Sequence, residues 1–216
     1  MSILRDIFLR MFGRPQGAIG RLGGLIMART NEKCGAWVID LLEIGPRESV
    51  LEVGFGPGVV VQRLSNQARQ VAGIDPSQEM VQQARARNAG AIEGGRVDLR
   101  RGSVESLPFD SNTFDKAVAI NSMQVWPDPV AGLREISRVM RPGGRIGLGF
   151  TRYSGQPSEG LTETLIAAGF TEAQVVSRVV FCNTGRIAFR HSAASADWRA
   201  RRARRSEKTD RERRSE

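Results

Sequence analysis

Cysteine and histidine, which build most metal centres and disulfide frameworks, are scarce in this sequence. The 216 residues include two cysteines and one histidine. Cys34 and Cys182 stand far apart in the chain and lack the short spacing of metal ligands. These counts predict a reduced, cytoplasmic protein with no metal centre. His191 follows the last predicted strand, where a surface position is favoured over a catalytic role.

Long apolar runs are also missing. No stretch reaches the roughly 18–20 consecutive apolar residues that a membrane-spanning helix needs. Near the N-terminus, Arg5, Asp6 and Arg10 interrupt the apolar positions and no small-residue cleavage site follows, so we expect no secretory signal. Hydrophobic residues still make up 40% of the chain, which is enough for the core of one domain.

Charge is distributed unevenly along the chain, whose net charge is +9. Residues 1–30 hold five arginines against one acid, and residues 197–216 hold nine basic residues against five acidic ones. The remainder is nearly neutral, whereas a nucleic-acid enzyme more often carries a basic stripe on its folded domain. We therefore favour a small-molecule partner and keep nucleic acid as the alternative. The sequence makes no prediction about oligomeric state.

The two charged ends indicate a chain of three parts. We predict a helical lid or extension at 1–45, the main domain at 46–195, and a disordered tail at 196–216, because that tail has few apolar residues to bury. Residues 2–12 have the period of an amphipathic helix, and residues 13–24 hold five glycines that could act as a hinge. The positive charge of the first 30 residues would favour an anionic membrane surface if this helix opened outward. A helix packed permanently on the domain is the alternative.

Apolar segments of the main domain alternate between strand and helix patterns. The predicted strands cover residues 50–53, 71–74, 97–101, 114–120 and 145–150. The predicted helices, with one that precedes the domain, cover residues 31–42, 59–66, 78–88, 130–140 and 160–168. Such alternation is typical of a parallel sheet covered on both faces. The sequence therefore predicts an α/β, Rossmann-like, doubly wound fold with a mainly parallel seven-stranded sheet.

The end of the domain departs from this alternation. Residues 174–181 and 186–190 are strand-like, and no helix separates them. Asn183, Thr184 and Gly185, which lie between the two runs, are typical turn residues. We therefore predict a C-terminal antiparallel hairpin at one side of the sheet.

The segment with the strongest chemical signal follows the first strand. Glu52 is followed by Gly54, Gly56 and Gly58 at alternate positions, immediately before a predicted helix. Glycines permit sharp backbone turns and the close approach of a ligand. Dinucleotide-binding proteins favour G-x-G-x-x-G, which leaves helix N–H groups open to a pyrophosphate. Here the pattern is E-x-G-x-G-x-G and Pro57 removes one donor, which indicates a ligand without phosphates and makes an NAD(P)-dependent oxidoreductase the weaker alternative.

At this point the chain resembles the class I S-adenosylmethionine-dependent methyltransferases, in five segments that occur in the family's order. The segments are residues 50–58, 71–77, 102–109, 114–121 and 133–150. The resemblance covers residues 49–150 and continues more loosely to residue 191. It implies S-adenosylmethionine as the cofactor and methyl transfer as the reaction.

The resemblance also implies roles for individual residues. Asp75, at the end of the second strand, would accept both ribose hydroxyls, and capping of the next helix is a compatible role. The three glycines would shape the floor under the methionine part of the cofactor. Glu52 would help to hold the glycine loop and the cofactor's amino group, with a strand-end charge as the alternative. Met80 would pack on the adenine, and an ordinary core methionine is the alternative.

The third segment departs from the family pattern. Many relatives carry an acid immediately after the glycine, where it takes the adenine amino group, and this chain has Ser103, a weaker acceptor. The adenine would then depend more on the backbone around Val104. Asn121, just past the fourth strand, would reach both cofactor and acceptor, with a turn residue as the alternative. Trp126 and Tyr153 are candidates for contact with the acceptor, and no general base is identified.

The predicted reaction is transfer of a methyl group to a small organic acceptor that is aromatic, quinone-like or lipid-like. After the fourth strand, Asn121-Ser122-Met123-Gln124 lacks the N/D-P-P-Y/F pattern of methyltransferases that act on base amino groups. Two alternatives stay open. One is an RNA methyltransferase that holds phosphate with the basic tail, and the other is a non-catalytic protein that binds S-adenosylmethionine.

Overall fold

A computed structural model of the chain describes residues 31–151, 154–157, 159–180 and 183–189. Several features predicted from the sequence lie outside these ranges: residues 2–12, 13–24 and 196–216, Tyr153, Cys182 and His191. Within the described part of the chain, no helix is both long and apolar enough to cross a membrane.

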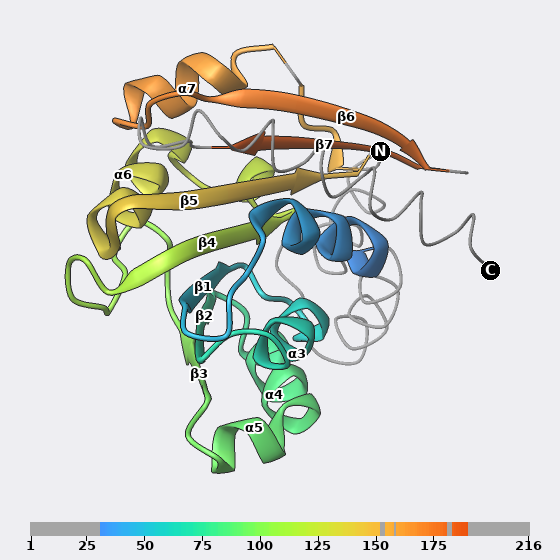
Figure 1. The fold of residues 1–216 in the computed structure, drawn as a ribbon, viewed down its shortest axis with the longest axis vertical. Helices are drawn as coiled ribbons and strands as arrows, with labels where there is room; N and C mark the ends of the chain where they lie inside the picture. The colour runs from blue at the N-terminus through green and yellow to red at the C-terminus, as the bar shows by residue number, and fades with distance from the viewer. Residues whose placement is uncertain (1–30, 152–153, 158, 181–182, 190–216) are drawn as a thin grey trace, which may run out of the picture.

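Five parallel strands form the centre of the sheet (Figure 1). They are β1 (Ser49–Val53), β2 (Gln70–Asp75), β3 (Val97–Arg101), β4 (Phe114–Ile120) and β5 (Met140–Phe150). Their order across the sheet is β3-β2-β1-β4-β5, so the chain runs outward from β1 and then returns to its other side. The order reverses between β1 and β4, which is where open sheets of this kind bind ligands. This arrangement confirms the predicted Rossmann-like α/β fold.

Helices lie on both faces of the sheet (Figure 1). One face carries the helix that contains residues 31–42, α3 (Val59–Ser65) and α4 (Gln78–Arg87). The other face carries α6 (Pro129–Val139) and α7 (Leu161–Ala167). The sheet therefore has two separate cores, one on each side.

Apolar periodicity explains which side of each helix faces the sheet. Val38, Ile39 and Leu42 of the first helix are fully buried in one core, and Leu133 and Ile136 of α6 are fully buried in the other. Their spacing of three and four residues is that of a single helical face. The division of the chain at residues 45 and 195 stays a prediction, although the helix before residue 45 contributes to the core.

The helix α6 ends one residue earlier than predicted, and the strand β5 begins five residues earlier than predicted. Asp128 caps α6 by accepting the N–H groups of the next turn, and Pro129 occupies the first helical position. The predicted helix includes Met140, but Met140 instead begins β5, opposite Phe114. The pairing of β4 with β5 then shifts register, and Gly143 adopts φ of 79° within this irregularity. A bulge of this kind produces no hydrophobic period along the sequence, so it could not be predicted from the pattern of apolar residues.

Two short elements have no counterpart in the sequence prediction. They are α5 (Ala89–Glu93) and the 3₁₀ helix η2 (Met123–Val125), which follows β4. Each is about one helical turn, which is too short to display a helical period.

The end of the described chain forms β6 (Gln174–Val180) and β7 (Asn183–Phe189). β7 pairs antiparallel with β5 and with β6, so the sheet continues in the order β5-β7-β6. The prediction that Asn183, Thr184 and Gly185 form the turn was wrong, because Asn183 already pairs with Val180.

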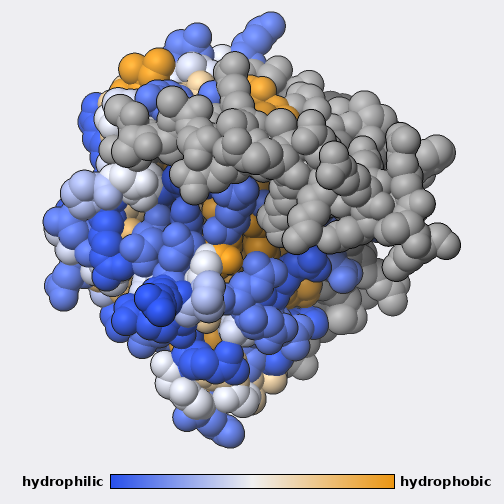
Figure 2. Space-filling view, in the orientation of Figure 1, coloured by the Kyte–Doolittle hydropathy of each residue, from blue (hydrophilic) through white to orange (hydrophobic). Residues whose placement is uncertain are grey.

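Polar residues cover most of the described surface on the side shown in Figure 2. Among the described residues, the large apolar side chains that are strongly exposed are Val125, Ile166 and Val175. Val125 belongs to η2 and is 52% exposed, which brings apolar surface to the loop after β4.

Candidate active site

A cavity of about 300 Å³ opens at the carboxyl ends of β1, β2, β3 and β4. Its wall includes residues from each strand end that the sequence singled out. The predicted residues that line it are Gly54, Gly56, Asp75, Met80, Ser103, Val104, Asn121 and Trp126. Glu52 and Gly58 were also predicted as site residues, but they do not line the cavity. The motifs and the topology therefore point to the same edge of the sheet.

The three glycines of the loop have three different surroundings. All adopt left-handed φ values: 72° at Gly54, 51° at Gly56 and 78° at Gly58. A Cβ on Gly54 would lie 2.5 Å from the Cβ of Ser122, and a Cβ on Gly58 would lie 2.7 Å from the Cβ of Ala84 in α4. A Cβ on Gly56 would meet nothing within 4 Å. Gly54 and Gly58 thus permit close packing within the protein, whereas Gly56 leaves open the space above the loop.

The Asp75 carboxylate is held by two backbone N–H groups. Its Oδ2 accepts from Gly56 N–H and its Oδ1 accepts from Ser77 N–H, each over 2.9 Å. Burial raises the pKa of Asp75 to about 6, although both N–H groups act in the opposite direction. The side chain that caps α4 is that of Ser77, which accepts from Met80 N–H. Each Asp75 oxygen can still accept a second hydrogen bond, so the carboxylate can accept hydrogen bonds from the hydroxyl groups of a ligand.

Glu52 is almost completely buried, with 2% of its surface exposed. Its Oε2 has no hydrogen-bond partner among the described residues. Burial, together with the nearby charge of Asp75, raises the pKa of Glu52 well above its ordinary value. A buried carboxyl group with a raised pKa therefore lies in β1, immediately before the glycine loop.

Apolar side chains border the cavity beside β2 and β3. Met80 is 1% exposed and Val104 is 6% exposed, and both line the cavity. Ser103 also lines it, and its Oγ accepts the N–H of Glu105 over 3.3 Å. The Ser103 hydroxyl thus already accepts one hydrogen bond, but it can still donate one and accept another. Met80 and Val104 offer apolar contact to a ring at this end.

Asn121 joins three segments of the chain at the end of β4. Its Nδ2 donates to Oδ1 of Asn31 over 2.7 Å, and its Oδ1 accepts the N–H of Thr151 over 2.8 Å. Its backbone N–H donates to the carbonyl of Gly149 in β5, and its φ is 48°. An ordinary turn residue does not require these side-chain contacts.

The loop after β4 forms the remaining side of the cavity. The Ser122 hydroxyl donates to the Val53 carbonyl over 2.9 Å, and the indole Nε1–H of Trp126 donates to Ser122 Oγ over 3.1 Å. These two bonds tie the Trp126 ring to the end of β1. Trp126 and the exposed Val125 give this side of the cavity an apolar character.

The sequence did not single out several residues that support this site. Asn31 and Ser122 line the cavity. At the end of α4, Arg87 Nε donates to the Pro57 carbonyl over 2.9 Å, and Asn88 Nδ2 donates to the Gly58 carbonyl over 3.1 Å. These two side chains hold the glycine loop from 30 residues away in sequence, a contact that leaves no local pattern.

Comparisons with known proteins bear on the family of this chain. Residues 51–148 match the family model of the methyltransferase domain. YdaC, an uncharacterized methyltransferase of Bacillus subtilis (strain 168), is 34% identical over 129 residues, which cover 59% of this chain and 69% of YdaC. Demethylmenaquinone methyltransferase of Corynebacterium kroppenstedtii is 37% identical over 105 residues, which cover 49% of this chain and 42% of that enzyme. Among solved structures, the cyclase SpnF matches with a TM-score of 0.58 and 30% identity, over 68% of this chain and 61% of SpnF.

The fold and the sequence matches define the class of protein. A parallel sheet whose order reverses beside a glycine loop, with an acid at the end of the next strand, is the arrangement that the sequence resemblance implied. The chain belongs to the class I S-adenosylmethionine-dependent methyltransferase family. It is an enzyme whose cofactor is S-adenosylmethionine.

Proposed function

We propose that this methyltransferase acts on a small organic acceptor that is aromatic, quinone-like or lipid-like. The observation that carries the proposal is the side of the cavity beyond β4, where Val125 and Trp126 offer apolar surface beside Asn31 and Asn121. Such a wall suits a mostly apolar ligand with a few polar groups. The relative named demethylmenaquinone methyltransferase supports it, because its name contains an acceptor of this kind.

We assign the cofactor site to the residues that the resemblance implied: Glu52, Gly54, Gly56, Gly58, Asp75, Met80, Ser103, Val104 and Asn121. The geometry fits S-adenosylmethionine. Asp75 keeps acceptor capacity for ribose hydroxyls. Glu52 has a carboxyl oxygen that lacks a partner in the described part of the chain, but it does not line the cavity, so its contribution would be indirect. Met80 and Val104 offer apolar contact for adenine. The contribution of Gly58 is indirect, through the packing of α4 against the loop.

The protein's part in the reaction is chiefly orientation. When bound, S-adenosylmethionine would supply an electrophilic methyl group to a nucleophile placed in line with the carbon–sulfur bond, and a neutral thioether would be the leaving group. Asp75 holds the ribose, and the Ser122–Trp126 contact holds the aromatic wall in place. Of the described residues that line the cavity, Asp75 alone has an acidic or basic side chain. We therefore assign no general base, and an acceptor that presents a free lone pair needs none.

Specific features of the chain favour two alternative functions. The basic tail at 197–216 could hold the phosphates of an RNA acceptor. The similarity to a cyclase also raises the case of a protein that binds S-adenosylmethionine and transfers no methyl group. Neither alternative accounts for the apolar wall formed by Val125 and Trp126 as directly as a small acceptor does.

The rest of the proposal concerns organisation. We propose that residues 1–45 form a lid or extension, that the first 30 residues contact anionic membrane surfaces, and that the tail from residue 196 is dispensable for a small acceptor. We further propose a cytoplasmic enzyme whose sheet is completed by the β6–β7 hairpin. Slow amide hydrogen exchange at residues 183–189 would support the hairpin, and fast exchange there would contradict it.

A methylation screen tests the proposed acceptor. Methyl-labelled S-adenosylmethionine is incubated with a metabolite extract and with RNA, using the wild type, a protein truncated after residue 195, and Asp75→Ala as the inactive control. We expect label in small molecules extractable into organic solvent, for both the wild type and the truncated protein. Label in RNA that disappears on truncation would favour the RNA alternative. Binding of S-adenosylhomocysteine with no labelled product in either fraction would favour a protein without methyl transfer.

A further inference from the structure

Gly132 lies in the interior of α6, where the helical backbone does not require a glycine. The residue is buried and its φ is not positive. Glycine in a helix interior lowers stability relative to alanine, because the unfolded chain gains freedom and no side chain packs in the folded one. The reason for a glycine at this position must therefore lie in its surroundings.

The surroundings of Gly132 are two side chains of the cavity wall. A Cβ at this position would lie 3.0 Å from Cε3 of Trp126 and 3.0 Å from Cγ1 of Val104. Both distances are shorter than the optimal separation of two carbon atoms, which is about 3.5–4.0 Å. Trp126 follows β4, Val104 follows β3, and both line the cavity. The missing side chain of Gly132 therefore lets two sides of the cavity wall approach the same point of α6.

The loop after β3 is bound to α6 on both sides of Gly132. The N–H of Asp128, at the start of the helix, donates to Oε1 of Glu105 over 3.1 Å. Beyond Gly132, Oε2 of Glu135 accepts the N–H of Leu107 over 3.1 Å. Positions 128, 132 and 135 follow one another at helical spacing, so they share one face of α6. These contacts hold the loop against the helix, and the loop cannot retreat to admit a side chain at position 132 without losing them.

Trp126 is held from a second direction. Its indole Nε1–H donates to Ser122 Oγ over 3.1 Å, and the Ser122 hydroxyl donates to the carbonyl of Val53 at the end of β1. The ring therefore lies between α6 and the end of β1. Val104 is 6% exposed, so its neighbours leave it little room. The cavity is the open direction for both side chains, and a larger residue at position 132 would displace them toward it.

We propose that Gly132 is a positioning residue that sets the width of the cavity, because it allows Val104 and Trp126 to lie close to α6. Gly132 acts on the cofactor through Val104, which we assigned to the adenine, and on the acceptor through Trp126. A side chain at position 132 would take space from both ligands. This inference rests on the proposed cofactor site, and it extends that site to α6, a helix that contributes no residue to the lining of the cavity.

The test compares the same substitution at two helical glycines of the full-length protein. Gly132→Ala adds a methyl group beside Trp126 and Val104. The matched control is Gly90→Ala in α5, where a Cβ would meet nothing within 4 Å. Both changes replace glycine by the best helix former. Calorimetry measures the affinity for S-adenosylhomocysteine, and thermal melts of the ligand-free proteins measure stability.

We expect Gly132→Ala to weaken S-adenosylhomocysteine binding by roughly threefold to thirtyfold, and Gly90→Ala to bind like the wild type. The melting temperature of ligand-free Gly132→Ala should not fall below that of the wild type, because the displaced side chains can move toward the cavity when no ligand competes for the space. The indole N–H signal of Trp126 in NMR spectra, assigned with Trp126→Phe, should shift in Gly132→Ala and stay in place in Gly90→Ala.

Smaller neighbours should restore the lost space. In the background of Val104→Ala or of Trp126→Phe, the further loss of affinity caused by Gly132→Ala should shrink to within about twofold. Wild-type affinity in Gly132→Ala would overturn the proposal, and so would a loss of affinity that neither background reduces. A wild type that does not bind S-adenosylhomocysteine would instead remove the proposed cofactor site, so the two failures are distinguishable.

Discussion

The backbone N–H of Gly56 donates a hydrogen bond of 2.9 Å to Oδ2 of Asp75. This bond joins the glycine loop after β1 to the acid at the end of β2, across 19 residues of sequence. Asp75 therefore serves the loop and the ligand with the same carboxylate. Any change at this position is expected to affect both the shape of the loop and the affinity for the cofactor.

Asp75→Ala should weaken binding of S-adenosylhomocysteine by roughly tenfold to a hundredfold, which corresponds to about 1.5–3 kcal/mol. The reason is the loss of hydrogen bonds that ribose hydroxyls donate to a charged acceptor. Calorimetry measures the affinity, and circular dichroism checks that the variant is folded. A folded variant with wild-type affinity would mean that the ribose lies elsewhere.

Cofactor binding should depend on pH through Asp75. Its pKa is raised by burial to about 6, and the ionised form is the better acceptor. In the free protein we expect affinity for S-adenosylhomocysteine to fall as pH drops below 6, approaching about tenfold for each pH unit. Asp75→Asn should remove this dependence between pH 5 and 7. A wild-type affinity that is flat across this range would contradict the assignment.

Ionisation of Asp75 should strengthen cofactor binding but lower the free energy of unfolding. A carboxyl group whose pKa is raised in the folded state keeps its proton there while the unfolded chain has lost it. The Asp75 contribution to the free energy of unfolding is therefore complete below pH 4 and is lost as pH rises through 6. Thermal melts of the ligand-free wild type and of Asp75→Asn would measure this contribution. The difference between their melting temperatures should change between pH 4 and pH 6. A constant difference would argue against the raised pKa.

Gly56 and Gly58 should respond differently to the same substitution. Both have left-handed φ, so alanine adds comparable backbone strain of about 1–2 kcal/mol at each. Gly58→Ala also brings a methyl group within 2.7 Å of Ala84, and overpacking of this kind adds about 1–3 kcal/mol. We expect the lower melting temperature for Gly58→Ala. Of these three variants, Gly56→Val should lower the affinity for the cofactor most. Equal melting temperatures for Gly56→Ala and Gly58→Ala would contradict the packing argument.

Arg87 should matter for the cofactor although it does not line the cavity. It holds the Pro57 carbonyl of the glycine loop, whereas Arg85, on the same helix, holds the Leu99 carbonyl of β3. Arg87→Gln should weaken S-adenosylhomocysteine binding by roughly threefold to tenfold, through a loop that is less well ordered. Arg85→Gln is the matched control and should bind like the wild type. Equal effects of the two variants would indicate a change in overall charge rather than in the loop.

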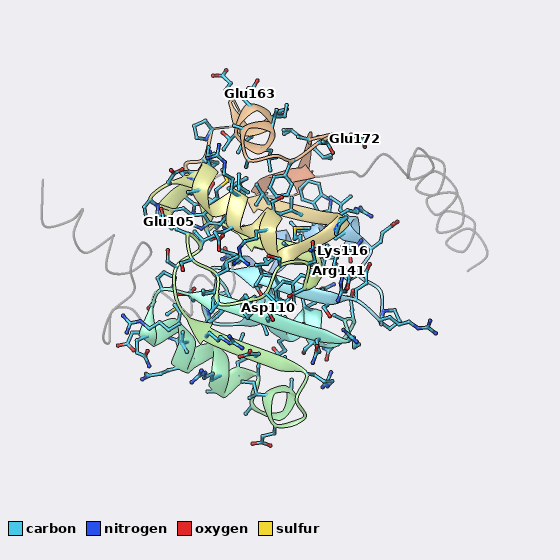
Figure 3. All side chains as sticks on the ribbon, turned by 90° about the vertical axis from the view of Figure 1, so that its left-hand side faces the viewer. Glu105, Asp110, Lys116, Arg141, Glu163 and Glu172 are labelled. Atoms are coloured by element: carbon cyan, nitrogen blue, oxygen red, sulfur yellow. The ribbon has the colours of Figure 1, made fainter. Side chains whose placement is uncertain are left out.

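An ionic cluster at the opposite end of the sheet should affect stability alone. In the view of Figure 3, Lys116 and Arg141 lie on one side of the domain and Glu105 lies on the other. Asp115 accepts from Ser49 N–H over 2.8 Å and from Arg141 over 2.7 Å. Burial would raise the pKa of Asp115, but these two donors outweigh it and the pKa is lowered.

Asp115→Ala should therefore lower the free energy of unfolding by about 1–3 kcal/mol, because the backbone N–H of buried Ser49 loses its partner. Arg141→Ala should cost less than about 1 kcal/mol, since its side chain is 42% exposed. In the wild type, the contribution of the Asp115 carboxylate to the free energy of unfolding is lost as pH falls through its lowered pKa. Denaturant unfolding at pH 7 compares the two variants, and a larger loss for Arg141→Ala would contradict this order.

Much of the fold could be predicted because its signals are local. The strands at 97–101 and 114–120 have the bounds that their apolar runs predicted. Errors occurred where tertiary pairing decided the backbone. Met140 belongs to β5 because it pairs with Phe114. Asn183 belongs to β7 because it pairs with Val180 of β6. The helical period that included Met140 and the turn propensity of Asn183 were weaker than the pairing of the strands.

The sequence by itself determined the class of fold, the glycine loop and the acid at the end of β2, because each depends on residues that are neighbours in the chain. The family and its cofactor follow from the same segments. Only the tertiary structure decided how Gly54, Gly56 and Gly58 differ, and that Asn31 meets Asn121 across 90 residues. The physical reason is that steric contact, burial and the direction of a hydrogen bond depend on what lies beside a residue in space. A pattern read along the chain contains the residue but not its neighbour.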